Sequence, residues 1–286
     1  MGFKQALRAI GWDGKLLANV MPWVGEPNHV HRCTSYNSDD PITIKRQADN
    51  MQMVGIDGVI LTWRGIDANG GWDQRVAINW VSELSKRNML FAYMPDPNLL
   101  KYKKNPAISD TNEIIRQFKD PSVQTILNSS TYMAEGYVFD FLTGYHVDWN
   151  AVKAVIPKIN ALMRHVGYEW PGLAGVSGVN SNHKNPNMKV PGIAFGFNDG
   201  GMPLPKGVTD ETLVTGRDYN TSVWGVGPAR VNDPQAGKYF MDVIDGIAAS
   251  SYARLAKYAA IVTWNDYDEG TDIESFVAGL TGVRIG

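Results

Sequence analysis

The segment Ile261-Val-Thr-Trp-Asn-Asp-Tyr-Asp-Glu-Gly-Thr-Asp-Ile-Glu274 is the most informative part of this chain. Its β-branched start, Ile261-Val-Thr263, predicts a buried strand. Aromatic and acidic residues follow at once. A strand that opens into aromatic rings and carboxylates is typical of a sugar-cleaving site in a barrel enzyme, because the rings stack on sugars and two carboxylates supply acid and base. The alternative is a strand that runs into a solvated acidic turn.

Length and composition fit one large globular domain. The chain has 286 residues, of which 44% are hydrophobic and 20% are charged. A single α/β barrel needs about 250 residues, so we predict one catalytic domain over residues 1–286. The net charge of −2 gives no reason to expect a nucleic acid or an anionic membrane as partner. Nine Trp and twelve Tyr favour a carbohydrate partner.

Cysteine usage and hydropathy exclude further classes. Cys33 is the only cysteine, so neither an intrachain disulfide nor a cysteine metal cluster can form. Residues 1–12 lack the apolar stretch of a signal peptide, and no run approaches the roughly 18 apolar residues of a membrane span. We expect a monomer or weak oligomer without a membrane span. An extracellular or periplasmic location is expected, reached by another export route or after removal of a signal.

Strand-like and helix-like segments alternate, which predicts a parallel sheet with crossover helices. Strands are expected at 16–21, 55–63, 89–94, 136–141, 172–177, 192–197, 221–225 and 259–263. Helices are expected at 43–53, 72–87, 110–133 with an interruption at Pro121, 149–165 and 234–257, and a loop at 180–191. Eight strands favour a single closed (β/α)8 TIM barrel over an open sheet, with its active cleft at the C-terminal ends of the strands.

Polar or aromatic residues follow nearly every predicted strand, where the βα-loops of a barrel build its site. The candidate substrate contacts are Trp23, His31, Trp63, Arg64, Asp96, Asp140, Asn198, Trp224, Trp264, Asn265 and Tyr267. For the tryptophans the alternative is packing in the core or at the barrel rim. For Asp140 it is a structural pair with a cation or a backbone amide. Asp96 lies between two prolines, which often mark an ordinary turn.

Asp266 and Glu269 are the candidate catalytic residues. Glycoside hydrolysis needs one carboxyl group to protonate the leaving oxygen and another to activate the attacking group. Three residues apart on a turn, both side chains can point into the same cleft. No cofactor is required for this chemistry, and none is predicted.

These residues carry a family resemblance. Trp264-Asn-Asp-Tyr267 followed by Glu269 resembles the Trp-Asn-Asp-Tyr-Gly-Glu segment of glycoside hydrolase family 71, the α-1,3-glucanases. The stretch 266–274 also resembles the Asn-Glu-Trp-His-Glu-Gly-Thr-x-Ile-Glu segment of family 99, the endo-α-mannosidases and endo-α-mannanases. Pro22-Trp23 and Gly55-Ile-Asp-Gly58 are similar to further segments of these families. The resemblance therefore touches both ends of the chain.

The resemblance implies a (β/α)8 barrel that cleaves an α-linked polysaccharide, and open clefts in related barrels imply endo action. It makes Asp266 the base, acting on water or on the substrate's own 2-hydroxyl, and Glu269 the general acid. Two positions depart from the pattern. Family 99 has Glu at the position of Asp266, and family 71 has Gly at that of Asp268, whose extra charge would raise neighbouring carboxyl pKa values if it faced the cleft.

Two other functions remain open from the residues. One is a glycan-binding barrel without turnover, which would keep the aromatic platforms. The other is a metal-dependent hydrolase of the amidohydrolase type, because His29 and His31 form a His-x-His after the first strand and Asp266 could serve as a further ligand. Against the metal site, the remaining histidines do not follow predicted strands, so no metal is predicted.

Overall fold

The computed structural model describes residues 3–26, 36–101, 103–140, 146–159, 161–166, 189–194, 197–198, 231–232, 257–262 and 264–265. For Asp140, Val262 and the described stretches between 161 and 232, the description is of the backbone. In chain order the elements are α1 (Phe3–Ala9), β1 (Lys15–Val20), α2 (Pro41–Met53), β2 (Gly58–Trp63), α3 (Trp72–Ser85), β3 (Leu90–Pro95), α4 (Pro97–Lys101), α5 (Asp110–Phe118), α6 (Pro121–Leu127), β4 (Tyr137–Asp140), α7 (Trp149–Val155), β5 (Ala161–Val166), β6 (Lys189–Ala194), β7 (Phe197–Asn198), β8 (Val231–Asn232) and β9 (Tyr258–Val262).

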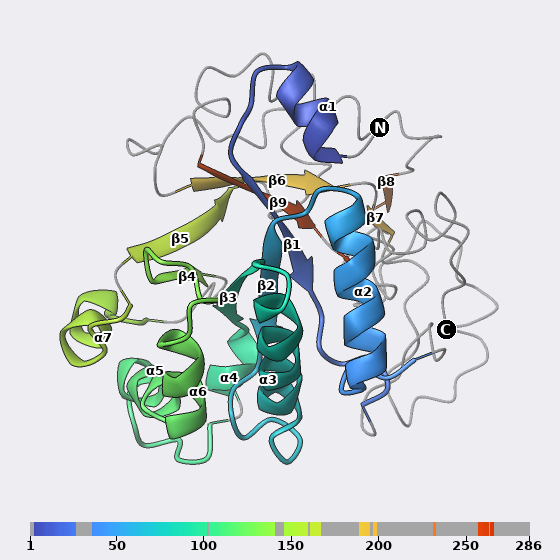
Figure 1. The fold of residues 1–286 in the computed structure, drawn as a ribbon. Helices are drawn as coiled ribbons and strands as arrows, with labels where there is room; N and C mark the ends of the chain where they lie inside the picture. Colours follow the sequence, from blue (N-terminus) through green and yellow to red (C-terminus); the bar gives the residue numbers. More distant parts are fainter. Residues whose placement is uncertain are drawn as a thin grey trace.

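Seven strands form one parallel sheet in the order β3-β2-β1-β9-β6-β5-β4 (Figure 1). The last strand pairs beside the first, with Ala18 opposite Ile261, as the return of a barrel requires. β3 and β4 lie at the two margins of the sheet. Among the described residues, Phe91 of β3 forms one parallel bridge with Tyr132, in the segment before β4. The architecture is therefore of the (β/α)8 type, and its ring is not closed by a ladder between β3 and β4.

Two apolar layers explain why the strands are buried on both faces. Alternate residues of β2 belong to different clusters, with Val59 and Leu61 packing toward the helices and Ile60 into the space enclosed by the sheet. The inner cluster contains Leu17, Ile60, Ala92, Met94, Met133, Phe139, Tyr258 and Ala260. A parallel strand covered on both sides reads as a continuous apolar run, which is why the early strands are visible in the sequence.

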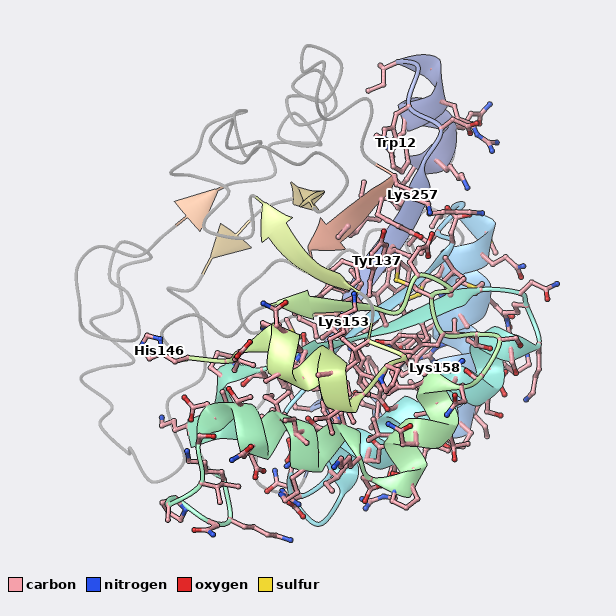
Figure 2. The ribbon with its side chains drawn as sticks, turned by 90° about the vertical axis from the view of Figure 1, so that its left-hand side faces the viewer. Trp12, Tyr137, His146, Lys153, Lys158 and Lys257 are labelled. Atoms are coloured by element: carbon pink, nitrogen blue, oxygen red, sulfur yellow. The ribbon has the colours of Figure 1, made fainter. Side chains whose placement is uncertain are left out.

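The amino end of the sheet is closed by α1. Asp57, just before β2, accepts from the backbone N–H of Leu16 (2.8 Å) and from Lys4 Nζ of α1 (2.5 and 2.7 Å). Lys15 N also donates to Lys257 O (2.9 Å), and Trp12 lies in this region (Figure 2). A Cβ at Gly14 would lie 2.7 Å from Lys257 O, so the close approach requires glycine here. Asp57 of the Gly-Ile-Asp segment therefore fixes this end of the fold.

Most predicted elements up to residue 155 are confirmed with shifts of a few residues, and so is the last strand. The predicted helical region 110–133 is wrong at its end, because α6 stops at Leu127 and Tyr132 forms a parallel bridge with Phe91. The predicted helix 149–165 is wrong in its second half, where Ala161–Val166 is a strand paired with β4. The helix α7 ends at Val155, ahead of Pro157, because proline cannot continue an α-helix. The predicted loop 180–191 is wrong at its end, where β6 begins at Lys189.

The middle of the sheet differs from the predicted strand order. β6 pairs directly with β9, with Ile193 opposite Ile261, where an eight-strand order has another strand between them. The strands predicted at 172–177 and 221–225 lie outside the described residues. The antiparallel pair β7–β8 forms a separate small sheet that the sequence did not predict. No helix in the described ranges is long and apolar enough to cross a membrane.

Candidate functional site

The stretch 264–274, called the acidic segment below, is anchored through Trp264 and Asn265 to the carboxyl end of β1. Asn265 is buried, and its Oδ1 accepts from Met21 N (2.8 Å) while its Nδ2 donates to Met21 O (3.0 Å). Nδ2 also lies 3.2 Å from the hydroxyl of Tyr36, to which it donates. The neighbouring Trp264 donates its backbone N–H to Asn19 O (2.7 Å). The side-chain amide thus imitates a strand partner and fixes where the chain leaves β9.

A buried ion cluster lies at the next strand end. Arg64, directly after β2, donates from Nη2 to Glu26 Oε2 (2.8 Å) and to Asp73 Oδ1 (2.5 Å). Its Nε and backbone N donate to Asp73 Oδ2 at 3.0 and 2.7 Å. Both carboxylate side chains are fully buried, and 13% of the Arg64 side chain is exposed. One arginine therefore joins the segment after β1, the end of β2 and the first turn of α3.

The electrostatics of this cluster keep Arg64 charged. Burial alone would lower the pKa of the guanidinium, but the hydrogen bonds and charges of Asp73 and Glu26 outweigh burial and raise that pKa above its ordinary value. The guanidinium carbon also lies 5.4 Å from the ring centroid of Trp23, within cation–π range. Glu26 Oε1 is buried without a hydrogen-bond partner. The cluster thus supports an aromatic ring at the edge of the site.

Asp96 follows β3 and is buried, with 6% of its surface exposed. Its Oδ1 accepts from Asn98 N (2.7 Å), and its own N–H donates to Trp63 O (2.9 Å). Burial raises the pKa of this carboxyl, an effect opposed by the hydrogen bond from Asn98 and by the charge of Arg64. Asp96 therefore forms the turn that its flanking prolines suggested, and it does so beside the ion cluster.

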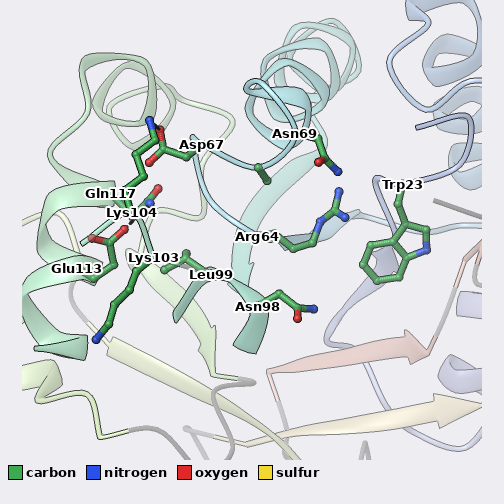
Figure 3. A pocket seen from close by; sticks show the side chains of 11 residues that line it. Trp23, Arg64, Asp67, Asn69, Asn98, Leu99, Lys103, Lys104, Glu113 and Gln117 are labelled. Carbon is green, nitrogen blue, oxygen red and sulfur yellow. Dashed lines mark hydrogen bonds and ion pairs between the residues drawn. The ribbon is translucent and has the colours of Figure 1, made fainter. Parts of the chain in front are cut away.

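A pocket of about 540 Å³ opens over these strand ends, and its volume falls in the range of small-ligand sites. Figure 3 shows Trp23 at one end, Arg64 and Asn98 between, and Lys103, Glu113 and Gln117 toward the other end. The full lining is Trp23, Arg64, Asp67, Ala68, Asn69, Asn98, Leu99, Lys103, Lys104, Glu113 and Gln117. The pocket lies where a barrel presents its βα-loops, at the carboxyl ends of β1, β2 and β3.

The predicted contacts separate into three groups. Trp23, Arg64, Asp96 and Asn265 are brought to the carboxyl ends of β1 to β3 and β9, and the first two line the pocket. Trp63 and Trp264 have no exposed surface, and Trp63 packs on Tyr93 and Phe118 with ring centroids 4.7 and 5.5 Å away. For these two the packing alternative describes the structure, because a ring with no exposed face cannot stack on a sugar.

The remaining predictions are not tested by the described residues. Asp140 ends β4, and Asn198 ends β7 with its backbone opposite Val231. The other predicted residues lie outside the described ranges: His31, Trp224, Asp266, Tyr267 and Glu269.

Several site residues were missed by the sequence predictions. Asp73 lies inside a helix in sequence and gives no sign that it pairs with a strand-end arginine. Asp67, Lys103, Lys104, Glu113 and Gln117 come from two loops and a helix that only the fold brings to one pocket. One signal was present in the sequence, where Gly65, Gly70 and Gly71 lie close to Asn69 in one loop. In the structure all four residues have positive φ, with 41° at Asn69. A glycine-rich βα-loop of this kind marks a constrained backbone.

Comparison with known proteins identifies the fold. No protein-family model matches the sequence, and no curated protein does. Two solved structures of the family 99 endo-α-mannosidase from Bacteroides thetaiotaomicron match with a TM-score of 0.57. The structure in complex with bis-tris propane is 15% identical and covers 92% of this chain and 87% of its own. The other is 12% identical and covers 92% and 88%.

At such identities the likeness establishes the fold. It agrees with the family 99 part of the sequence resemblance; the family 71 part stays a prediction. The chain therefore has the α/β barrel fold of the family 99 endo-α-mannosidases, with a polar pocket at the carboxyl ends of its first strands.

Proposed function

We propose that this protein is a glycoside hydrolase that cleaves internal bonds of an α-linked polysaccharide. Support comes from the acidic segment after β9, from the pocket at the carboxyl ends of β1 to β3, and from the fold shared with endo-α-mannosidases. The observation that carries the proposal is the anchor of Asn265 on Met21. It starts the acidic segment beside β1, whose following segment supplies Trp23 to the pocket.

Asp266 and Glu269 perform the chemistry in this proposal. Glu269 donates its proton to the glycosidic oxygen as the bond from that oxygen to the anomeric carbon breaks. Asp266 removes a proton from water, whose oxygen then bonds to the anomeric carbon. In the other route Asp266 removes the proton of the substrate's 2-hydroxyl, whose oxygen bonds to the anomeric carbon, and water then opens the ring that this bond closes. Water supplies the hydroxyl of the new reducing end and returns the proton to the pair.

The test is release of reducing sugar from a panel of α-glucans, α-mannans and bacterial capsular or exopolysaccharides. The parent should release sugar from one class of polymer. Asp266→Asn and Glu269→Gln should each lower kcat by a factor of 10² or more, since general acid–base groups contribute about 10²–10⁴. Asp13→Asn is the matched control, because Asp13 is an exposed carboxylate ahead of β1, at the opposite end of the sheet. Thermal melting should show all three variants folded.

The outcomes separate the alternatives. Activity that survives both site variants would contradict the assigned pair. Binding of an oligosaccharide without any release would replace the hydrolase with a glycan-binding barrel. Loss of parent activity on treatment with a chelator, restored by a divalent metal, would favour a metal hydrolase.

A further inference from the structure

The pocket described above extends from Trp23, near the described residue Asn265, to the helix α5. Its inner end is Trp23, two residues after Met21, which holds Asn265. Its outer end is formed by Lys103, Lys104 and the helix α5 (Figure 3). A chain cleaved beside Asn265 could therefore continue along the ends of β2 and β3. The chemistry of the lining decides which chain it accepts.

The charged groups of the outer lining are paired, either with one another or with residues just outside the pocket. Asp67 accepts from Lys104 Nζ (2.5 Å) and from Arg116 Nη2 (2.5 Å). Burial alone would raise the pKa of Asp67, but these two cations hold that pKa below its usual value. Lys103 donates to Asp110 Oδ1 at 3.0 Å and to Ile108 O at 2.7 Å.

Deeper in the lining the same pairing continues. Glu113 is nearly fully buried and accepts from Arg116 and from Gln117 Nε2 (2.7 Å). With Arg64 held by two carboxylates, every cation among the described lining residues is paired with a carboxylate, which weakens the attraction of an anionic group. The polar atoms of the lining are nonetheless dense. An uncharged ligand rich in hydroxyl groups fits this lining better than an anionic one, because hydroxyls both donate and accept.

The lining is held in place before any ligand binds. Gln117 Oε1 accepts from Ile66 N (2.8 Å), which docks the loop after β2 onto α5. A Cβ on Gly65, whose φ is +102°, would lie 2.8 Å from that same oxygen. The loop therefore has one arrangement against the helix. A preformed pocket loses less entropy on binding than a mobile one.

We propose that this pocket is a subsite for uncharged sugar units of the polysaccharide at a distance from the bond that is cleaved. The proposal rests on the proposed function for the position of cleavage, but its ligand class comes from the paired charges of the lining. Trp23 offers its partly exposed ring to the first of these units. Asn69 and Asn98 face the same space with side-chain amides (Figure 3).

The test compares long and short substrates of the polymer class identified above. Asn69→Gly removes an exposed amide without backbone strain, since Asn69 has a positive φ of 41° that glycine adopts freely. Asn88→Gly is its matched control, an exposed asparagine with φ of 53° in the turn between α3 and β3. Trp23→Ala removes the ring. The kcat/KM on long chains should fall about tenfold more than on short ones in Trp23→Ala, and severalfold more in Asn69→Gly.

Binding and charge provide independent measurements. Calorimetry with a neutral oligosaccharide should show weaker binding to Trp23→Ala and Asn69→Gly and unchanged binding to Asn88→Gly. A carboxymethylated form of the polymer should be a poorer substrate than the neutral form. Asp67→Asn should reduce the ratio of kcat/KM on the neutral polymer to kcat/KM on the carboxymethylated polymer severalfold. The change leaves Lys104 and Arg116 with one carboxylate fewer, so an anionic substrate is attracted more strongly.

The subsite and the proposed function fail in different ways. A parent that cleaves polymer, with variants that lose the same factor on long and short chains, would overturn the subsite and leave the hydrolase. A parent that cleaves nothing, yet binds oligosaccharide through Trp23 and Asn69, would overturn the hydrolase and keep the subsite. Preference for the carboxymethylated polymer would overturn the assignment to uncharged sugars.

Discussion

The two ends of the parallel sheet both contain buried or half-buried carboxylates, and they use them differently. At the amino end, Asp57 binds Lys4 and the backbone of Leu16, so its oxygens hold α1 and β1 together. At the carboxyl end, Arg64 joins Glu26 and Asp73 beside an open pocket, and one oxygen of Glu26 has no partner. The difference agrees with the general division of barrels, in which the amino face gives stability and the carboxyl face gives function.

The largest change in stability should come from Arg64→Met, which tests whether Glu26 and Asp73 at the carboxyl end depend on Arg64 for their neutralisation. The change leaves two buried carboxylates without their cation, and it should lower the free energy of unfolding by about 3–5 kcal/mol. Urea denaturation at neutral pH measures it. Arg75→Met is the control, because Arg75 also lies near a tryptophan ring and pairs with Asp39, but its side chain is 49% exposed.

Arg75→Met should lower the free energy of unfolding by less than about 1 kcal/mol, because exposed ion pairs contribute little to stability. Equal losses in the two variants would contradict the view that burial makes the Arg64 cluster different. The stability of Arg64→Lys should lie between those of the parent and Arg64→Met. Lysine restores the positive charge, but it lacks the planar guanidinium that bonds Glu26 and Asp73 at the same time.

A smaller effect is expected at the amino end from Asp57→Ala. It leaves the N–H of Leu16 and the ammonium of Lys4 without their carboxylate, and should lower the free energy of unfolding by about 1–3 kcal/mol. The kcat/KM on the active polymer should stay at the parent value because Asp57 lies at the opposite end of the sheet from the pocket. A change in kcat/KM, measured well below the melting temperature, would contradict the division between the two ends.

The smallest effect concerns Asp96 and the pH dependence of stability. Burial raises its pKa in the folded protein, so the folded state binds this proton more tightly than the unfolded state. The stabilisation by this proton is full below the unfolded pKa and is lost as the pH rises through the folded pKa. Asp96→Asn, which is never charged, should therefore be more stable than the parent at neutral pH.

The measurement is urea unfolding of parent and Asp96→Asn between about pH 3 and pH 7. The advantage of the variant should shrink as the pH falls toward the ordinary aspartate pKa. A difference that is constant over this range would show that the carboxyl does not titrate with folding.

The sequence by itself determined the early half of the fold and the nature of its last strand. Segments such as Gly58–Trp63 are continuous apolar runs because both of their faces are covered, and Asp40 before Pro41 marks a helix start through its own hydrogen bonds to the backbone. It also predicted that Trp23 and Arg64 lie after strands whose carboxyl ends meet at one edge, and both line the pocket there; their contact with substrate stays a prediction.

Only the tertiary structure decided the partners of those residues and the order of the strands. The pairing of Arg64 with Asp73 and the docking of Gln117 on Ile66 join positions whose sequence neighbours give no sign of contact. The burial of Trp63 and Trp264 likewise depends on which side chains lie opposite them, because a tryptophan after a strand suits a rim and a core equally well. The adjacency of β6 and β9 is a property of the assembled sheet, as local propensity carries no information about which strand lies beside which.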